Sequence, residues 1–182
     1  MEPSDMLRVT CFVSSLEGSA GGRAALDSAF PSAAINVVQM QRLPVNPASE
    51  CEAVARLRNA GERVKLLNPQ GLDPSPNYSQ MALVRTPKVI ISGTQMAFGG
   101  QEADVQLAFE RLQKALASVN TGFDHLAMSY VYLTNMQMAD KVRAVRKTFY
   151  TAKNPPASTL LPFEGLPSLD ATFGVDVVAA VE

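Results

Sequence analysis

An internal repeat constrains the fold of this chain more than any other feature of its sequence. Val9–Leu16 aligns with Ser129–Met136 at a shift of 120 positions, and Arg23–Phe30 falls on Arg143–Tyr150 at the same shift. With small gaps the alignment continues from Asn36–Pro44 onto Thr159–Pro167, which share a Leu-Pro step, and from Glu50–Ala55 onto Gly174–Ala179. Such a repeat indicates one supersecondary unit used twice, here a strand, a helix and further strands.

Hydrophobic periodicity predicts the individual elements. Apolar residues recur on one helical face in 101–120 and in 138–150, so each segment is predicted to be a helix that packs on a sheet. The segment Glu50–Ala55 fits both a capped helix and a strand, and the repeat favours the strand. The other predicted strands, rich in β-branched and aromatic residues, are Leu7–Val13, Asn36–Arg42, Arg63–Leu67, Val89–Ser92, Met128–Thr134 and Ala171–Ala179.

The two copies of the repeat belong to segments of unequal length. Residues 64–182 are predicted to form a complete unit, residues 1–58 only the second half of such a unit, and residues 59–63 a linker. A half-unit cannot bury its own sheet face. We therefore expect it to pack on a complete unit, either of its own chain or of a neighbouring one. Alternatively, the chain is a fragment of a longer tandem protein.

Charge and cysteine content exclude several classes of function. The formal net charge is −1, with no basic excess to follow a nucleic-acid backbone. No run near 18 apolar residues predicts a membrane span, and the acidic start argues against a secretory signal. We expect a cytoplasmic protein in which Cys11 and Cys51 are reduced thiols within strands. With His125 they cannot complete a four-ligand zinc site, so no metal or cofactor is expected.

An ordered set of short motifs resembles a known family. The chain is similar to the YjgF family, the reactive-intermediate deaminases (Rid), which also carry the name L-PSP endoribonuclease. The matching pieces in 64–182 are Tyr78-Ser79-Gln80, Ser92-Gly93, Val131–Met136, Thr148-Phe149-Tyr150, Pro155-Pro156-Ala157, Leu166-Pro167 and the strand around Asp176. The N-terminal half resembles the family's second half through Val38-Gln39, Arg42-Leu43-Pro44 and Glu50–Ala55.

The resemblance implies an α+β fold, chorismate-mutase-like, with a mixed β-sheet and two helices on one face. It also implies a trimer with a ligand cleft at each subunit interface. Active members of the family hydrolyse reactive imines or enamines to keto acids and ammonia without a metal or cofactor. An arginine after the Pro-Ala step holds the substrate carboxylate, and a glutamate on the last strand positions the attacking water. A tyrosine and a Ser-Gly step line the cleft.

These family positions map onto the sequence only in part. The tyrosine position matches Tyr78, and the Ser-Gly step matches Ser92 and Gly93. Asp176 stands in place of the glutamate, and Glu52 occupies the corresponding position in the first copy of the repeat. The arginine position falls on Ser158 in the second copy and on Ile35 in the first. The candidate substitutes for the missing arginine are Arg143 and, in a second candidate site, Arg23.

Each candidate also has a structural explanation. Tyr78 would equally anchor a hairpin, and Ser92-Gly93 would equally mark a bulge. Asp176 on an apolar strand needs partners or a shifted pKa whether or not it lines a cleft. Arg143 lies in a basic helix segment whose default environment is solvent.

Three functions follow from these features. The one we favour is a small-molecule-binding or assembly protein that kept the cleft and lost deaminase chemistry with the arginine. The second is an active imine or enamine deaminase in which Asp176 positions water. The third, a ribonuclease, is disfavoured by the neutral charge. Expected partners are copies of the chain, as a trimer or larger homo-oligomer, and a small ligand, of which a carboxylate is one candidate; nucleic acid and membrane are not expected.

Overall fold

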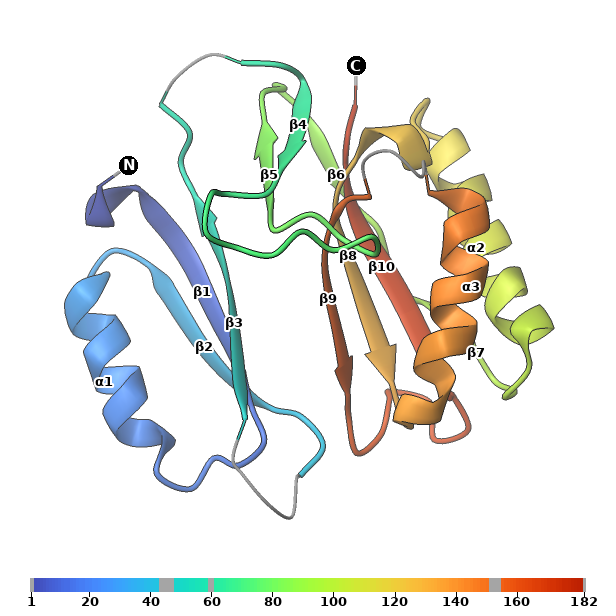
Figure 1. Ribbon diagram of the computed structural model, residues 1–182, viewed down its shortest axis with the longest axis horizontal. Helices are drawn as coiled ribbons and strands as arrows, with labels where there is room; N and C mark the ends of the chain where they lie inside the picture. Colours follow the sequence, from blue (N-terminus) through green and yellow to red (C-terminus); the bar gives the residue numbers. More distant parts are fainter. Residues whose placement is uncertain (1, 43–47, 59–60, 151–154, 182) are drawn as a thin grey trace. The chain divides into compact units, whose positions relative to one another are not determined.

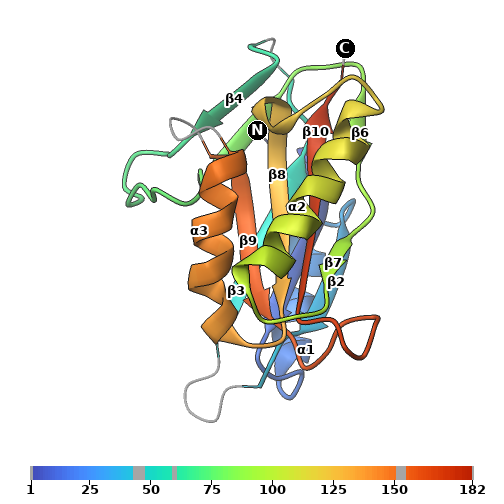
Figure 2. The ribbon, with the colours of Figure 1, turned by 90° about the vertical axis from the view of Figure 1, so that its right-hand side faces the viewer.

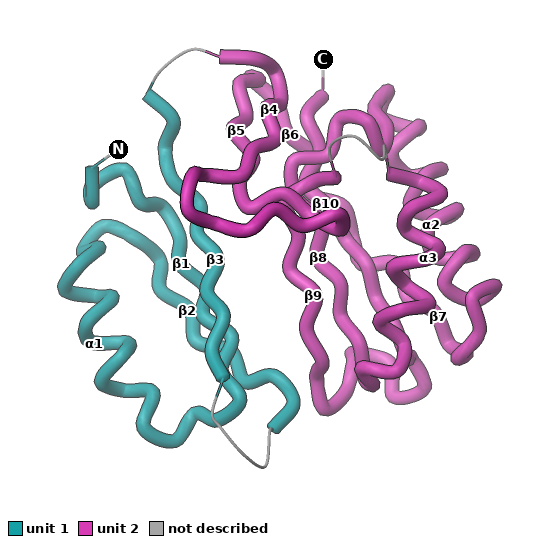
Figure 3. The backbone as a smooth tube through the Cα atoms, viewed as in Figure 1, with its two compact units in different colours: residues 1–59 teal, residues 60–182 magenta. Residues whose placement is uncertain are grey.

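The computed structural model describes residues 2–42, 48–58, 61–150 and 155–181. The chain divides into two compact units, Met1–Asn59 (unit 1) and Ala60–Glu182 (unit 2), shown in two colours in Figure 3. The shared Leu43-Pro44 step of the sequence repeat lies outside the described residues.

Unit 1 is a three-stranded sheet with one helix. Its elements, after a short 3-10 turn at Pro3–Asp5, are β1 (Met6–Val13), α1 (Ser19–Ala29), β2 (Ala34–Gln39) and β3 (Ser49–Ala55). The strand order is β2-β1-β3, with β1 parallel to β2 and antiparallel to β3. Helix α1 runs along one face of this sheet (Figure 1). The ambiguous segment at Glu50–Ala55 is thus a strand, as the repeat favoured.

Unit 2 is built on a larger mixed sheet. Its elements are β4 (Val64–Leu67), β5 (Met81–Val84), β6 (Val89–Ile91), β7 (Gln95–Ala97), α2 (Glu102–Ala117), β8 (Leu126–Leu133), α3 (Ala139–Phe149), β9 (Ala157–Pro162) and β10 (Phe173–Ala180), with 3-10 turns at Phe123–His125 and Met136–Met138. The order is β6-β10-β8-β9, β7 also pairs with β10, and β4 and β5 form a hairpin. Figure 2 shows α2 and α3 side by side over one face of the sheet. The predicted α+β class is confirmed.

Both copies of the sequence repeat have the same topology and strand register. β8 and α3 each begin and end 120 positions after β1 and α1. In both copies the first strand lies between a parallel and an antiparallel partner. Thr10 is opposite Glu52 in unit 1, and Tyr130 is opposite Asp176 in unit 2. The pairing irregularity after Met6 recurs at the equivalent place in unit 2.

The core of unit 2 lies between the sheet and its two helices. The predicted apolar stripe of α2 is completely buried, with Phe109 at its centre. The ring of Phe109 stacks on Phe149 from α3 and Phe173 from β10, with centroid distances of 5.2 and 5.9 Å. Burying one such side chain contributes roughly 1.5–3 kcal/mol to folding. The aromatic cluster therefore holds both helices on one face and leaves the opposite face, here called the open face, uncovered by them.

Unit 1 has a much smaller core, and it contains a disulfide. Within the described part of unit 1, the buried apolar cluster consists of Val9, Cys11 and Ile35, and no residue of α1 is fully buried. Cys11 and Cys51 are directly opposite each other on β1 and β3 and are bonded through their sulfur atoms. The prediction of two reduced thiols was therefore wrong. It rested on cysteine number, whereas the bond depends on the β1–β3 register across 40 positions of sequence.

Within the described residues, no helix has the length and apolar character needed to span a membrane. The same part of the chain contains no group of three or more His, Cys, Asp or Glu side chains arranged to hold a metal ion.

Candidate functional site

Asp176 is a carboxylate embedded in an otherwise apolar strand. Its neighbours Val175 and Val177 are completely buried on the helix side of the sheet. Because successive side chains of a strand point to opposite faces, Asp176 lies on the open face. The Thr94 hydroxyl donates a hydrogen bond to Oδ2 of Asp176, with an oxygen–oxygen distance of 2.8 Å. The sequence analysis identified Asp176 but missed Thr94, which lies 82 positions away in the sequence.

Two tyrosines flank this carboxylate. Tyr130 is the direct cross-strand neighbour of Asp176 on β8, and Tyr132 lies two positions further on the same face. Their rings are nearly parallel, with centroids 6.5 Å apart and an interplanar angle of 4°. Phe163 meets the ring of Tyr132 edge-on at 5.7 Å. The spacing of two positions between these tyrosines, on a strand predicted from the sequence, could have identified them as residues of one sheet face.

The surroundings of Asp176 disfavour its charged form. Burial raises the pKa of the Asp176 carboxyl above its ordinary value, and hydrogen bonds from Thr94 and Tyr132 partly oppose this rise. No cationic side chain of the described residues contributes to the shift. Asp176 is therefore an acceptor supported by neutral hydroxyl groups rather than half of an ion pair.

Ser92 and Gly93 lie beside Asp176, in the break between β6 and β7. Both of these short strands pair with β10. The Ser92 N–H donates to the carbonyl of Val177 at 3.0 Å, and its Oγ accepts from the Val177 N–H at 3.0 Å. The Ser92 N–H is thus already bonded to β10 and does not point to a ligand. Gly93 is exposed, and an added Cβ would meet no atom within 4 Å.

Tyr78 lies on the loop between β4 and β5, and 36% of its surface is exposed. Its neighbours fix that loop to the start of β9: the Ser79 hydroxyl donates to the Pro155 carbonyl at 2.7 Å, and the Ser79 N–H donates to Pro156 at 3.1 Å. Among the described residues, no hydrogen bond or ring contact joins Tyr78 to Asp176. In this single chain the structure does not bring the two together.

Ser158, at the family's arginine position, contacts an arginine that the sequence analysis missed. Arg146 of α3 donates from Nη1 to Ser158 Oγ at 3.1 Å and from Nη2 to the Asn77 carbonyl at 2.7 Å. Its guanidinium lies 5.6 Å from the ring centroid of Tyr150. Arg146 is only 4% exposed. Burial lowers the pKa of Arg146, Arg143 adds to that effect, and Tyr150 opposes it.

Ser158 and Asp176 lie on opposite faces of the sheet. Ser158 is paired with Ser129 of β8, whose buried hydroxyl bonds the Tyr150 hydroxyl at 2.7 Å on the helix side. Asp176 is in line with Tyr130 on the open face. The Arg146 guanidinium, held by Ser158, is therefore separated from Asp176 by the sheet itself.

Arg143, the substitute named from the sequence, lies on the exposed side of α3. Its Nη1 donates to Asp140 Oδ1 at 2.9 Å, one turn earlier on the same helix. This ion pair is partly solvated on the arginine side and almost fully solvated on the aspartate side. The arginine that contacts Ser158 is therefore Arg146, whereas Arg143 is bonded to Asp140 on the helix surface.

The first copy of the site differs in its electrostatics. Glu52 occupies the position equivalent to Asp176, but its carboxylate pairs with Arg8 of β1 at 3.2 Å. Ile35, equivalent to Ser158 by register, is buried in the small core of unit 1. Arg23 pairs with Asp27 at 2.8 Å on the surface of α1. Unit 1 therefore has a carboxylate at the position equivalent to Asp176, but there the carboxylate forms an ion pair with Arg8 of the neighbouring strand.

Comparison with known proteins identifies the family of unit 2. The family model described as Endoribonuclease L-PSP matches residues 69–181. A Rid-family protein of unknown function from Yersinia pestis has a similar fold, with a TM-score of 0.59 and 18% identity over 66% of this chain and 100% of its own. A YjgF-family structure from Mycobacterium tuberculosis has a TM-score of 0.47 and 15% identity over 65% and 99% of the two chains. No curated protein matches the sequence. The chain belongs to the Endoribonuclease L-PSP family, the family of YjgF and Rid proteins.

Proposed function

We propose that the protein binds a small molecule at Asp176 and does not carry out the imine hydrolysis of active family members. The observation that supports this proposal is the position of Ser158. This residue stands where the family resemblance requires a carboxylate-binding arginine, and its hydroxyl accepts a hydrogen bond from the buried Arg146. Neither side chain is on the face that carries Asp176. The reaction would thus lack the group that holds its substrate.

The loss of that arginine is large in energetic terms. A guanidinium offers a carboxylate two parallel charged hydrogen bonds in a fixed geometry. Removing one partner of such a desolvated pair costs on the order of 2–5 kcal/mol. This corresponds to roughly 30-fold to several-thousand-fold in affinity or rate. Arg143 does not offset the loss, because its guanidinium is paired with Asp140 on the surface of α3.

The charges of the site favour a particular class of ligand. Asp176 contributes a negative charge when it is ionised. Burial raises the pKa of its carboxyl, and no cationic side chain among the described residues lowers it again. A ligand carboxylate would be repelled there. An amine or protonated imine would donate to Asp176 while its apolar part lies against Tyr130 or Tyr132. We therefore propose an amino- or imino-containing ligand, bound where copies of the chain meet, rather than a simple carboxylate.

An assay of freshly generated imino acids tests the proposal. An amino-acid oxidase would supply them, ammonia and keto acid would be measured, and an arginine-containing family member would serve as the positive control. We expect the rate with this protein to equal the spontaneous rate while the control is active. Release above that rate, abolished in Asp176→Ala but kept in Asp170→Ala, would contradict the proposal and establish the second candidate.

That second candidate is an active imine or enamine deaminase. It is favoured by one observation, the Asp176 carboxyl held by Thr94 at 2.8 Å with a pKa raised by burial. A carboxyl in such surroundings suits the positioning or activation of water. In this case another cation, supplied by a neighbouring subunit, would have to hold the substrate.

The cytoplasmic location stays a prediction. In the cytoplasm the Cys11–Cys51 bond would face a reducing environment.

A further inference from the structure

The outer edge of β3, the edge that faces away from β1, is a strand edge in unit 1. Within the described part of the chain, β3 pairs with β1 alone. Five of its seven residues are exposed, and the strand contains no proline or lysine, two residues that commonly protect an edge against further pairing. Such an edge presents a row of N–H and C=O groups that another strand can bind.

The register between β1 and β3 determines which backbone groups point to this outer edge. The Ser14 N–H donates to the Ala48 carbonyl at 3.0 Å, immediately before β3 begins. Opposed residues of an antiparallel pair alternate between hydrogen-bonded and non-hydrogen-bonded pairs. Continuing this alternation along the register, the N–H and C=O groups of Cys51 and Ala53 point away from β1. Both residues are exposed.

In unit 2 the equivalent backbone groups are bonded to a second neighbour. Ala53 corresponds to Val177 of β10 through the equal register of the two copies, and Cys51 corresponds to Val175. The Val177 carbonyl accepts from the Ser92 N–H at 3.0 Å, and the Val177 N–H donates to Ser92 Oγ at 3.0 Å. Val175 pairs with β7. Because β6 and β7 both run antiparallel to β10, the duplicated fold accepts an antiparallel strand at this edge.

The side chains of β3 add a preference for charge. Glu50 and Glu52 lie at alternate positions of the strand, on the sheet face opposite to α1. Glu52 is paired with Arg8, whereas Glu50 has no ion pair with a described residue. Desolvation raises the pKa of the Glu50 carboxyl, and the Glu52 carboxylate adds to this rise. A cation directly opposite Glu50 would therefore be favourable, and a further acid would not.

We propose that the outer edge of β3 binds an extended segment of another protein, antiparallel to β3 and with a lysine or arginine opposite Glu50. Main-chain hydrogen bonds to Cys51 and Ala53 supply the affinity, and side chains at alternate positions supply the specificity, as in other cases of strand addition. A second copy of β3 fits less well. The full-length antiparallel register of two such strands places Glu52 opposite Glu52 of the second copy, and like charges directly opposite each other are destabilising.

Titration of the isotope-labelled full chain with synthetic peptides, followed by NMR, tests the proposal. The probe peptide has the seven-residue length of β3 and alternates valine with lysine. One control peptide has glutamate in place of each lysine, and another has proline in place of each valine. With the lysine–valine peptide alone, we expect the amide signals of Cys51 and Ala53 to shift and their exchange with solvent to slow. The amides of Val175 and Val177 already face a neighbouring strand and serve as the internal control.

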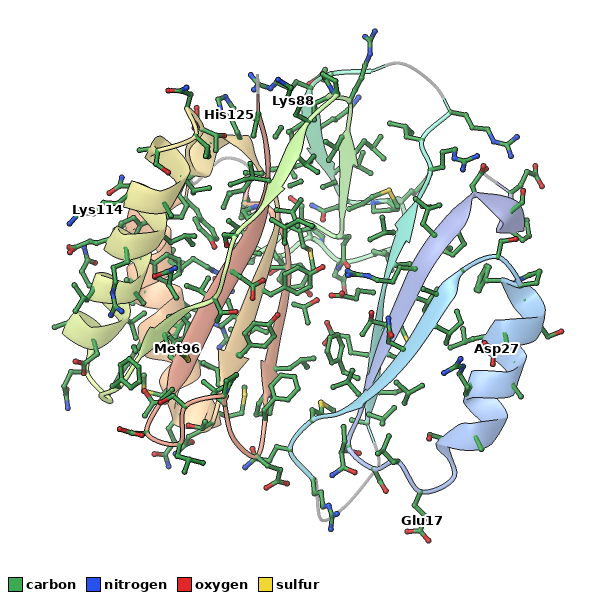
Figure 4. The ribbon with its side chains drawn as sticks, turned by 180° about the vertical axis from the view of Figure 1, so that it is seen from behind. Glu17, Asp27, Lys88, Met96, Lys114 and His125 are labelled. Atoms are coloured by element: carbon green, nitrogen blue, oxygen red, sulfur yellow. A yellow bond between two sulfur atoms is a disulfide. The ribbon has the colours of Figure 1, made fainter. Side chains whose placement is uncertain are left out.

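Two substitutions test the individual contacts. Glu50→Gln should weaken binding of the lysine–valine peptide roughly twofold to fivefold, the range for one cross-strand charge pair. Ala53→Pro removes an outward N–H at an edge position that β1 does not use, and it should weaken binding by up to roughly tenfold. The matched control for the charge is Glu17→Gln, which should leave binding unchanged. Glu17 is exposed in the loop between β1 and α1, and its side chain points away from the sheet of unit 1 (Figure 4). The amide signals of β1 would show that each variant is folded.

Three results would overturn the proposal. The first is unchanged Cys51 and Ala53 amides at millimolar concentrations of the lysine–valine peptide. The second is an equal response to either control peptide, since main-chain pairing or charge would then play no part. The third is protection of the same two amides in the peptide-free protein that disappears on dilution, which would make a second copy of the chain the occupant of the edge. None of these outcomes depends on the imine assay, because β3 belongs to unit 1 and the Asp176 site belongs to unit 2.

Discussion

The clearest consequence at the scale of single residues concerns Asp176 and pH. Because burial raises its folded-state pKa above the ordinary value of 3.8, ionisation of Asp176 opposes folding. Its favourable contribution is complete below the unfolded-state pKa and is lost as pH rises through the higher folded-state pKa. Asp176→Asn keeps an oxygen for Thr94 and removes the charge. We expect this variant to melt higher than the wild type at pH 7.

The stability difference for Asp176→Asn should be below about 1 kcal/mol, because partial exposure of the carboxyl screens the effect. It should shrink toward zero as the pH is lowered through the folded-state pKa and below 3.8. Thermal denaturation at a series of pH values measures this. A lower stability of Asp176→Asn at pH 7 would contradict this prediction, because it would mean that the folded protein stabilises the ionised carboxylate of Asp176.

A second residue-scale prediction concerns the buried Arg146. Its guanidinium joins α3 to Ser158 of β9 and to the Asn77 carbonyl. Arg146→Ala would leave these acceptors and a cavity behind, at a cost of roughly 2–4 kcal/mol. Arg146→Met fills the space without a charge that must be desolvated, so its cost should be clearly smaller. Urea unfolding of both variants measures the difference, with the exposed Arg143→Ala as the control near zero.

Local sequence pattern could predict some of these residues but not their contacts. The repeat identified Asp176 and Glu52 as equivalent, and their equal register supports that alignment. Arg146 could have been found as well, because it lies on the same helical face as Val142 and Val145. Thr94 could not, since its bond to Asp176 depends on how the broken β6–β7 edge aligns with β10. The disulfide likewise depends on strand register.

At the scale of elements, the two copies of the repeat differ in how their sheets are held. The positions of Cys11 and Cys51 in unit 1 correspond to Val131 and Val175 in unit 2, which are cross-strand neighbours in a large core. Helix α1 has no fully buried residue. The disulfide therefore compensates for the weak packing of unit 1. Closing a loop of 40 residues stabilises a fold by roughly 4 kcal/mol in the chain-entropy model.

Replacing both cysteines by valine, as in unit 2, tests this role. We expect Cys11→Val with Cys51→Val to lower the stability of unit 1 by somewhat less than the roughly 4 kcal/mol of the loop closure, because the buried valines recover part of it. Hydrogen exchange of the amides in β1 and β3 should accelerate markedly. The amides of β8 and β10 provide an internal control and should change little. Unchanged exchange in β1 and β3 would mean that packing alone holds the sheet.

At the scale of the whole molecule, the uncovered sheet face of unit 2 bears on assembly. Val89 and Ile91 of β6 lie on the open face with Val178, and Ile91 is 77% exposed. Apolar side chains exposed together on a sheet without covering helices mark an interaction surface. The family resemblance implies a trimer, and we propose that this chain too associates with copies of itself. Unit 1, with half the elements of a complete unit, would extend or modify that assembly.

Light scattering of the purified chain at micromolar concentration tests the assembly directly. We expect a mass of at least three chains, and we expect Ile91→Glu to dissociate it because a charge would be buried without a partner. Leu107→Glu is the matched control, since Leu107 is also exposed but lies on α2, away from the open face. A stable monomer for the wild type would contradict the proposal. Equal dissociation by both variants would move the interface from the open face of the sheet to a surface that includes α2.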